Sequence, residues 1–228
     1  MIDYFETAKY PLLDKKNFLI GFIVGTLSFL ILPIFFVFGY LSKTIRETLK
    51  KSDQLPSWDK FEYWKDYFVH GIFVLFIIIM YILPAFLISV AAFSFIGMPA
   101  ETVFETDEPW EEPFFMEGSV VSAITVVLLF FGSLLFIVAL FLLPMAIVLY
   151  SASEDIRYAF KLDEIFPKIK NMIIPYAKAF LVSIFVFFLA FLVLFVPGVG
   201  FFIGGILFYP ILFTGRLFAE VFRDFNYE

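Results

Sequence analysis

The stretch Leu32-Pro33-Ile34-Phe35-Phe36-Val37 returns, with changes, as Leu143-Pro144-Met145-Ala146-Ile147-Val148. Ser42, Arg46 and Lys50 follow the first copy at the same distances at which Ser153, Arg157 and Lys161 follow the second, and every matched pair is 111 residues apart. In both copies a long apolar segment meets a polar one. Because an internal repeat determines the architecture of a chain, the sequence predicts a membrane module built as a tandem parallel repeat.

The composition points to lipid as the solvent. The chain has 228 residues, of which 62% are hydrophobic and 17% charged, whereas soluble domains have roughly 45–50% apolar and about 25% charged residues. With no Cys and a single His, His70, the chain has no means of forming disulfides or Cys- or His-based metal cages. The basic residues form no dense patch, so we do not expect nucleic acid as a partner.

Five segments are long and apolar enough to cross a bilayer, which takes about 20 residues. They are read as helices because runs such as Leu128-Leu129-Phe130-Phe131 are apolar on every side and do not alternate as barrel strands do. Pro197-Gly198-Val199-Gly200 predicts a tight turn between the last two. The five segments are 18–41, 67–95, 120–150, 177–196 and 201–218.

The distribution of Lys and Arg predicts the orientation. The segments 42–66 and 151–176 are basic and are predicted to be cytoplasmic, whereas 96–118 has no Lys or Arg and seven acidic residues, which predicts an external loop. Five spans then place the N-terminus outside, against the evidence of Lys9, Lys15 and Lys16. If the first segment is instead re-entrant and bent at Pro33, the N-terminus stays inside.

We therefore expect one membrane domain over residues 1–228. It comprises a first repeat unit at about 17–95, the acidic external loop 96–118, a second repeat unit at about 119–197, and a final helix at about 199–222. The final helix resembles a third partial copy through Pro210, Gly215 and Arg223.

Two amphipathic helices are predicted at the cytoplasmic interface. In the first helix, from Trp58 to Phe68, aromatic and charged residues are interleaved, and Ser57 is the predicted N-cap. In the second, apolar residues from Leu162 to Ile173 recur at helical spacing with charged residues between them. Trp and Tyr favour the headgroup level, so we expect both helices to lie in the interface.

Several landmarks resemble a family of uncharacterised, mainly archaeal membrane proteins, catalogued as domain of unknown function 4013. They are Tyr10-Pro11, the span through Pro33 to Gly39-Tyr40, Arg46, Leu55-Pro56-Ser57-Trp58-Asp59, Gly71 and the hairpin at 196–200. The resemblance implies a multi-pass membrane protein and supplies no substrate and no catalytic residues.

The candidate site consists of four arginines near helix ends: Arg46, Arg157, Arg216 and Arg223. One interpretation is a set of guanidinium groups that bind anionic lipid headgroups. The other is positive-inside anchoring, with each Arg at the negative end of a helix dipole.

No catalytic, cofactor-binding or metal-binding motif is found, so we expect no enzyme and no cofactor. The sequence favours a non-catalytic scaffold, or a module that binds lipid or another membrane protein at the cytoplasmic face. The alternative is a facilitative permease or lipid-handling carrier. A polar cavity at mid-membrane would favour the carrier, and the residues available to line it are Ser28, Ser89, Thr125, Ser133 and Ser183.

Overall fold

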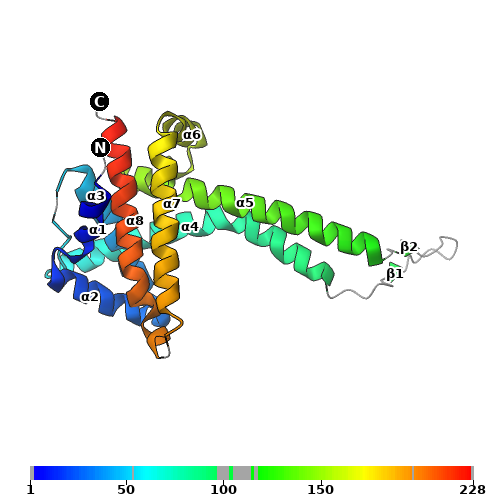
Figure 1. Ribbon diagram of the computed structural model, residues 1–228, viewed down its shortest axis with the longest axis horizontal. Coiled ribbons are helices and arrows are strands. Elements are labelled where there is room, and N and C mark those ends of the chain that lie inside the picture. Colours follow the sequence, from blue (N-terminus) through cyan, green and yellow to red (C-terminus); the bar gives the residue numbers. More distant parts are fainter. Residues whose placement is uncertain are drawn as a thin grey trace. The chain divides into compact units, whose positions relative to one another are not determined.

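The computed structural model describes residues 3–52, 54–96, 103–104, 114–115, 118–196 and 198–226. The protein is almost entirely helical (Figure 1). The α-helices are α1 (Tyr4–Lys9), α2 (Lys15–Thr26), α3 (Leu32–Leu49), α4 (Phe61–Ile96), α5 (Gly118–Ser153), α6 (Leu162–Asn171), α7 (Ile173–Val193) and α8 (Ile203–Asn226). The 3₁₀ turns are η1 (Tyr10–Leu12), η2 (Leu27–Leu30), η3 (Ile156–Phe160) and η4 (Val199–Phe202).

The chain forms two compact units. Unit 1 consists of Met1–Ile78 and Leu142–Glu228, and unit 2 consists of Ile79–Phe141. Unit 2 contains parts of α4 and α5 and a short antiparallel strand pair, β1 (Val103–Phe104) and β2 (Phe114–Phe115). The predicted acidic loop 96–118 lies almost entirely outside the described residues.

In the part of the chain that the structure describes, four helical segments are long and apolar enough to cross a membrane. They are 61–94, 123–153, 173–193 and 199–225, and they correspond to the second to fifth predicted segments. Gly198 adopts a φ of 84° in the turn between α7 and α8, a conformation that suits glycine. A turn between the last two helices, as predicted, is therefore found at Gly198, while Pro197 of the predicted turn lies outside the described residues.

The first predicted span is not one helix. The segment 18–41 is divided between α2 and α3 by the turn η2 and by Ile31, whose φ is 67°. The sequence contains no Gly at this point, and Pro33 follows the break as an early residue of α3. Pro has no N–H and is well tolerated in the first turn of a helix. The prediction of five spanning helices is therefore not confirmed.

Helix α8 is the centre of unit 1. It packs against α2, α3 and α7, and half of its most apolar window is buried, compared with 17–22% in the other three candidate spans. Along α8, Gly25 of α2 contacts Gly204, and Gly21 contacts Phe208 further on, so α2 runs antiparallel to α8.

Helix α3 runs in the opposite direction to α2. Leu41 lies against Gly215, and Arg223 donates a hydrogen bond to the carbonyl of Thr48. From the first contact to the second, residue numbers rise along both α3 and α8, so the two helices are parallel. Helices α2 and α3 thus form a hairpin whose turn lies near the N-terminal end of α8 and whose two open ends point toward the C-terminal end of α8.

The copies of the repeated stretch occupy different structures. The first copy begins helix α3, whereas the second lies inside α5, with Pro144 in the helix interior. The break at Ile31 has no counterpart before Leu143, because α5 continues from Gly118. The tandem repeat is therefore not confirmed as a structural repeat.

The two predicted interfacial helices also differ from each other. The stretch from Trp58 to Phe68 is not a separate helix, because Phe61 begins α4 and the helix continues without a break to Ile96. The second prediction corresponds in position to α6, in which Ile165 and Ile169 are buried.

Candidate functional site

The segment from Gln54 to Trp58 is held by aromatic side chains from three parts of unit 1. It has no regular secondary structure, so its backbone groups need other partners. Four of its carbonyl groups accept hydrogen bonds from aromatic O–H or N–H donors. These bonds run from Tyr10 Oη to Gln54 (3.2 Å), from Tyr40 Oη to Pro56 (2.9 Å), from Tyr67 Oη to Ser57 (2.8 Å) and from Trp64 Nε1 to Trp58 (2.8 Å).

The centre of this arrangement is a stacked aromatic pair. The rings of Tyr40 and Trp58 are parallel, with centroids 4.6 Å apart, and Tyr67 packs edge-on against both. All three side chains are buried. Stacked and edge-to-face aromatic pairs contribute about 0.5–1.5 kcal/mol each beyond their area burial. Leu55 and Trp58 of the Leu55–Asp59 motif therefore belong to the core of unit 1. We call residues 55–59 together with the four aromatic donors the aromatic clamp.

The N-terminal segment is joined to the aromatic clamp. Asn17 Oδ1 accepts a hydrogen bond from the backbone N–H of Trp58, and the side chain of Asp14 accepts one from Asn17 Nδ2. At the surface, Lys16 and Asp59 form an ion pair of 2.6 Å. The hydrogen bond from Lys16 lowers the pKa of Asp59, and the same bond raises the pKa of Lys16. Residues 14–17 and 55–59 thus lie at the same end of unit 1.

A charged cluster joins α3, α4 and the end of α5. The buried Arg46 of α3 forms ion pairs with Glu154 and with Asp66, the latter at 3.7 Å. His70 lies 3.2 Å from Asp66 through Nε2 and 2.8 Å from the hydroxyl of Tyr150 through Nδ1. The hydroxyls of Ser42 and Ser151 complete the contact between α3 and α5 at 3.1 Å.

Two opposing effects act on Glu154 in this cluster. Partial burial raises its pKa, whereas the charge of Arg46 and the hydrogen bond from that guanidinium lower it, and the net pKa is below the ordinary value. Because the pKa of Glu154 is lowered on folding, the pair with Arg46 stabilises the protein above the unfolded pKa. That contribution is lost as the pH falls through the folded pKa.

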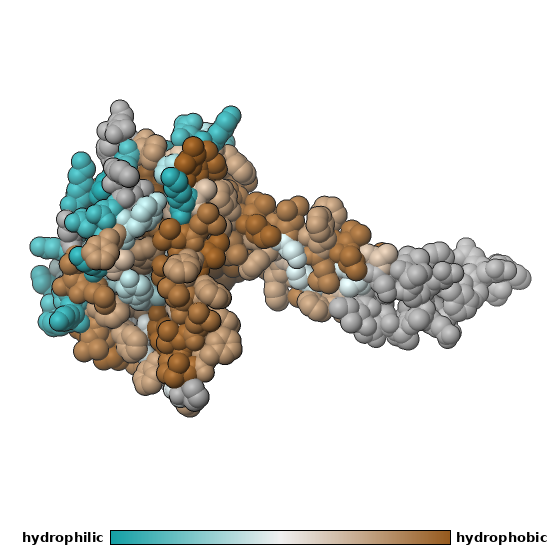
Figure 2. Space-filling model, in the orientation of Figure 1, coloured by the Kyte–Doolittle hydropathy of each residue, from teal (hydrophilic) through white to brown (hydrophobic). Residues whose placement is uncertain are grey.

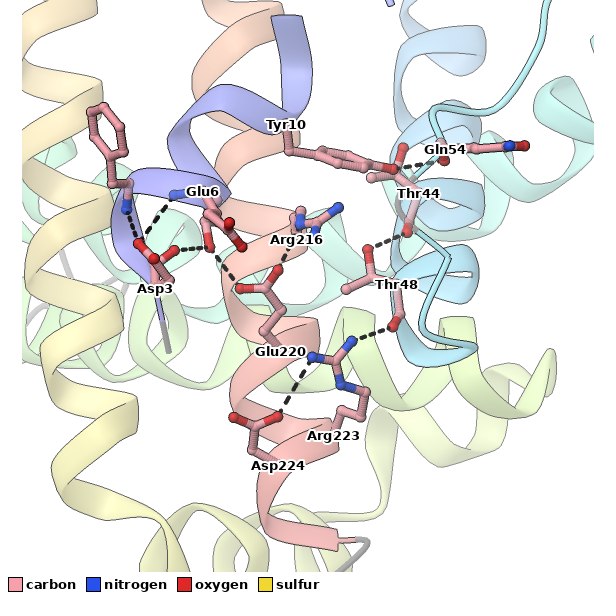
Figure 3. A network of polar contacts seen from close by, with 12 residues as sticks. Asp3, Glu6, Tyr10, Thr44, Thr48, Gln54, Arg216, Glu220, Arg223 and Asp224 are labelled. Carbon is pink, nitrogen blue, oxygen red and sulfur yellow. Dashed lines mark hydrogen bonds and ion pairs between the residues drawn. The ribbon is translucent and has the colours of Figure 1, made fainter. Parts of the chain in front are cut away.

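A second polar cluster surrounds α8 (Figure 3). The side chains of Arg216 and Glu220 are both buried and form an ion pair of 2.6 Å. Thr7 of α1 donates a 2.6 Å hydrogen bond to the second carboxylate oxygen of Glu220, and the guanidinium of Arg216 lies 3.8 Å from the ring centroid of Tyr10. Residues 7–10 therefore cover a buried charge pair.

The four predicted arginines lie in different environments. Arg46 and Arg216 are buried in ion pairs with acidic side chains of this chain. Arg223 is partly exposed and contacts the carbonyl of Thr48 and the side chain of Asp224 (Figure 3). Arg157 is exposed in η3. Arg46 and Arg157 occupy equivalent positions in the sequence repeat, but their surroundings have little in common.

Sequence reasoning missed the acidic partners of these arginines. Glu220 follows Arg216 by four residues, a spacing at which side chains meet on one helix face, so this pair was visible in the sequence. Glu154 and Arg46 are separated by 108 residues, and no local pattern connects them. Within the described ranges, no three His, Asp or Glu side chains are grouped so that they could hold a metal ion.

The five hydroxyl residues proposed as a cavity lining are distributed over four helical elements. Ser28 lies in η2 and Ser183 on α7 in unit 1, while Ser89, Thr125 and Ser133 belong to unit 2. Ser89 and Ser133 line one cavity of about 320 Å³ between α4 and α5. The other lining residues are Gly and apolar residues.

Comparison with known families confirms the resemblance inferred from the sequence motifs. The family described as "Protein of unknown function (DUF4013)" matches residues 26–199. The chain belongs to this family. The DUF4013 match includes α3, the aromatic clamp segment Leu55–Asp59 and the spans of α4, α5 and α7. No curated protein and no solved structure matches the chain. The DUF4013 description names no activity, and the evidence for a membrane protein is the four apolar helices.

Proposed function

We propose that this protein is a non-catalytic membrane scaffold, a module that binds lipid or a protein partner at the cytoplasmic face. The observation that carries the proposal is that the two buried arginines form ion pairs within the chain. Arg46 and Arg216 are each held by a carboxylate of the same chain. The Arg46–Glu154 pair joins α3 to the residue that follows α5. The Arg216–Glu220 pair lies within α8 and is joined to α1 by Thr7. Both guanidinium charges are thus balanced by carboxylates of this chain, which supports a structural role for them. The hydrogen bonds of the aromatic clamp likewise connect different elements of unit 1 and have a structural role.

The proposed orientation places the N-terminus, residues 42–66, residues 151–176 and the C-terminus in the cytoplasm. Three facts support it. Both open ends of the hairpin of α2 and α3 point toward the C-terminal end of α8. The segments 42–66 and 151–176 are basic, as the positive-inside rule expects of cytoplasmic segments. Lys9, Lys15 and Lys16 then lie on the cytoplasmic side as well, in agreement with the same rule. Figure 2 shows hydrophilic residues gathered around the ends of the chain and α6, with hydrophobic residues along α7.

In this orientation α2 and α3 form a re-entrant hairpin. Its turn carries exposed apolar side chains, among them Leu27, Leu30, Ile31 and Leu32. Exposed apolar residues at a turn are costly in water, at about 25 cal/mol per Å² of apolar surface, and are stable in hydrocarbon. We therefore propose that the turn enters the bilayer and that the protein has four spanning helices.

Single Cys substitutions test this topology directly, because the chain has no Cys. With a membrane-impermeant thiol reagent, we expect Lys15→Cys, Lys51→Cys and Lys170→Cys to label only after the cells are permeabilised. Leu30→Cys is expected to resist labelling in both conditions because the turn lies in hydrocarbon. Labelling of Lys15→Cys but not Lys51→Cys in sealed cells would restore the five-span arrangement.

The scaffold proposal is tested by mass spectrometry of the protein extracted with its native lipid shell. We expect a stoichiometric protein partner or a retained lipid and no small-molecule substrate. A bound polar metabolite at one copy per chain would contradict the scaffold and favour a permease.

The second candidate function is a facilitative permease or a lipid-handling carrier. One observation favours it, namely the cavity between α4 and α5 in unit 2, to which Ser89 and Ser133 contribute hydroxyl groups. The chemistry of that cavity decides what it would accept.

A further inference from the structure

The two hydroxyl groups that line the cavity of unit 2 form hydrogen bonds within their own helices. Ser89 donates its hydroxyl hydrogen to the carbonyl of Ala85 (2.9 Å), and Ser133 donates to the carbonyl of Leu129 (2.7 Å). Each bond lies within one helix, as is common for Ser in apolar helices. The two hydroxyl groups therefore present no free donor to an occupant. A polar solute would lose its hydration without gaining such a donor, which disfavours its binding.

The cavity is long and narrow. Its lining extends from Ile82 to Ser89 of α4, a distance of about 10 Å along the helix axis. Its volume over this length is about 320 Å³.

The cavity opens on an apolar surface that is suited to contact with lipid. The lining residues Phe86 and Phe136 are exposed, and both belong to segments apolar enough to span a membrane. Gly132 of α5 is buried against Ser89, so the floor of the cavity is formed by small side chains. An apolar, narrow cavity that opens beside exposed phenylalanines accepts a hydrocarbon chain.

We infer that the cavity between α4 and α5 binds one acyl chain of a bilayer lipid. This inference rests on the proposed membrane function and deepens it, because it assigns a lipid-binding site to unit 2. It also limits the carrier alternative to lipid-like cargo.

The test is photo-crosslinking of the full-length protein in phosphatidylcholine vesicles that contain a tracer lipid with a diazirine in its acyl chain. We expect the modified residues to concentrate in 82–89 and 132–137. Ser133→Phe fills the cavity from an exposed lining position and should lower crosslinking there at least threefold. Leu135→Phe is the matched control, since it adds the same ring on the same helix, about 200° around from Ser133, and should leave crosslinking unchanged.

Three results would overturn the inference. One is equal crosslinking in Ser133→Phe and the unsubstituted protein. Another is crosslinking no denser at the cavity than along the exposed apolar side chains of α7. The third is efficient disulfide formation by Ser133→Cys at low protein density, which would make a second copy the occupant. Protein that stays in the aqueous fraction and crosslinks nowhere would instead refute the membrane function itself.

Discussion

Glu220→Ala should lower the stability of the protein by about 3–5 kcal/mol, the typical cost of removing one partner from a buried ion pair. Glu220 and Arg216 are both buried, so the guanidinium would keep its charge without the carboxylate that now balances it. Thr7 would lose the acceptor of its 2.6 Å hydrogen bond. In a thermal unfolding measurement in detergent, we expect a fall in Tm of roughly 10 °C.

A double variant separates the charge effect from a packing effect. Arg216→Met with Glu220→Met removes both charges and replaces them by flexible apolar side chains, and it should recover most of the lost stability because a buried pair is often replaceable by apolar residues. Glu47→Ala serves as the control. Its pair with Lys43 is 3.8 Å long and partly exposed, so we expect a change below about 1 kcal/mol. A double variant as unstable as Glu220→Ala would show that packing, not charge, dominates.

Gly39→Ala is the second variant with a large expected effect. A Cβ atom at Gly39 would overlap the carbonyl oxygen of Tyr67, so α3 and α4 would have to separate at their closest approach. Overpacking of this kind costs typically about 1–3 kcal/mol and occasionally more. The direction of the change in stability is informative, because Ala in a helix interior is otherwise favoured over Gly by about 1 kcal/mol.

The same contact has a second glycine and a suitable control. Gly71→Ala places its Cβ against the carbonyl oxygen of Phe35 and should lower the Tm to a similar extent. Gly200→Ala meets nothing within 4 Å and should melt like the unsubstituted protein. If Gly39→Ala melts at a higher temperature than the parent, helix propensity outweighs the close contact and α3 does not approach α4 this tightly.

The sequence predicted the long helices well, because hydropathy alone marks them. Four of the five predicted segments overlap the candidate spans, and Gly198 marks the turn before α8. The break between α2 and α3 was foreseen only in the alternative of a re-entrant segment bent at Pro33, because residues 27–32 are as apolar as a span and contain no Gly. Pro33 is the local signal for this break, whereas the packing of the turn η2 against α8 joins parts of the chain more than 170 residues apart and has no local signal.

The candidate site was only partly predictable. Positive residues near helix ends identified Arg46, Arg157, Arg216 and Arg223, but the sequence could not show which of them are buried. The Leu55–Asp59 landmark was recognised as a family feature, yet its role depends on donors such as Tyr10 and Tyr67, which reach it from other elements. Distant hydrogen bonds of this kind follow from the fold and not from spacing.

The order of synthesis matters for a hairpin that rests on the final helix. Helices α2 and α3 leave the ribosome early, whereas α8, which packs against both of them and closes on Gly21 and Gly25 of α2, follows more than 150 residues later. Contacts between distant parts of a chain form slowly, because a long loop has to close first. The first hydrophobic segment is therefore synthesised well before the helix that buries it, and it stays without this neighbour until α8 has been made.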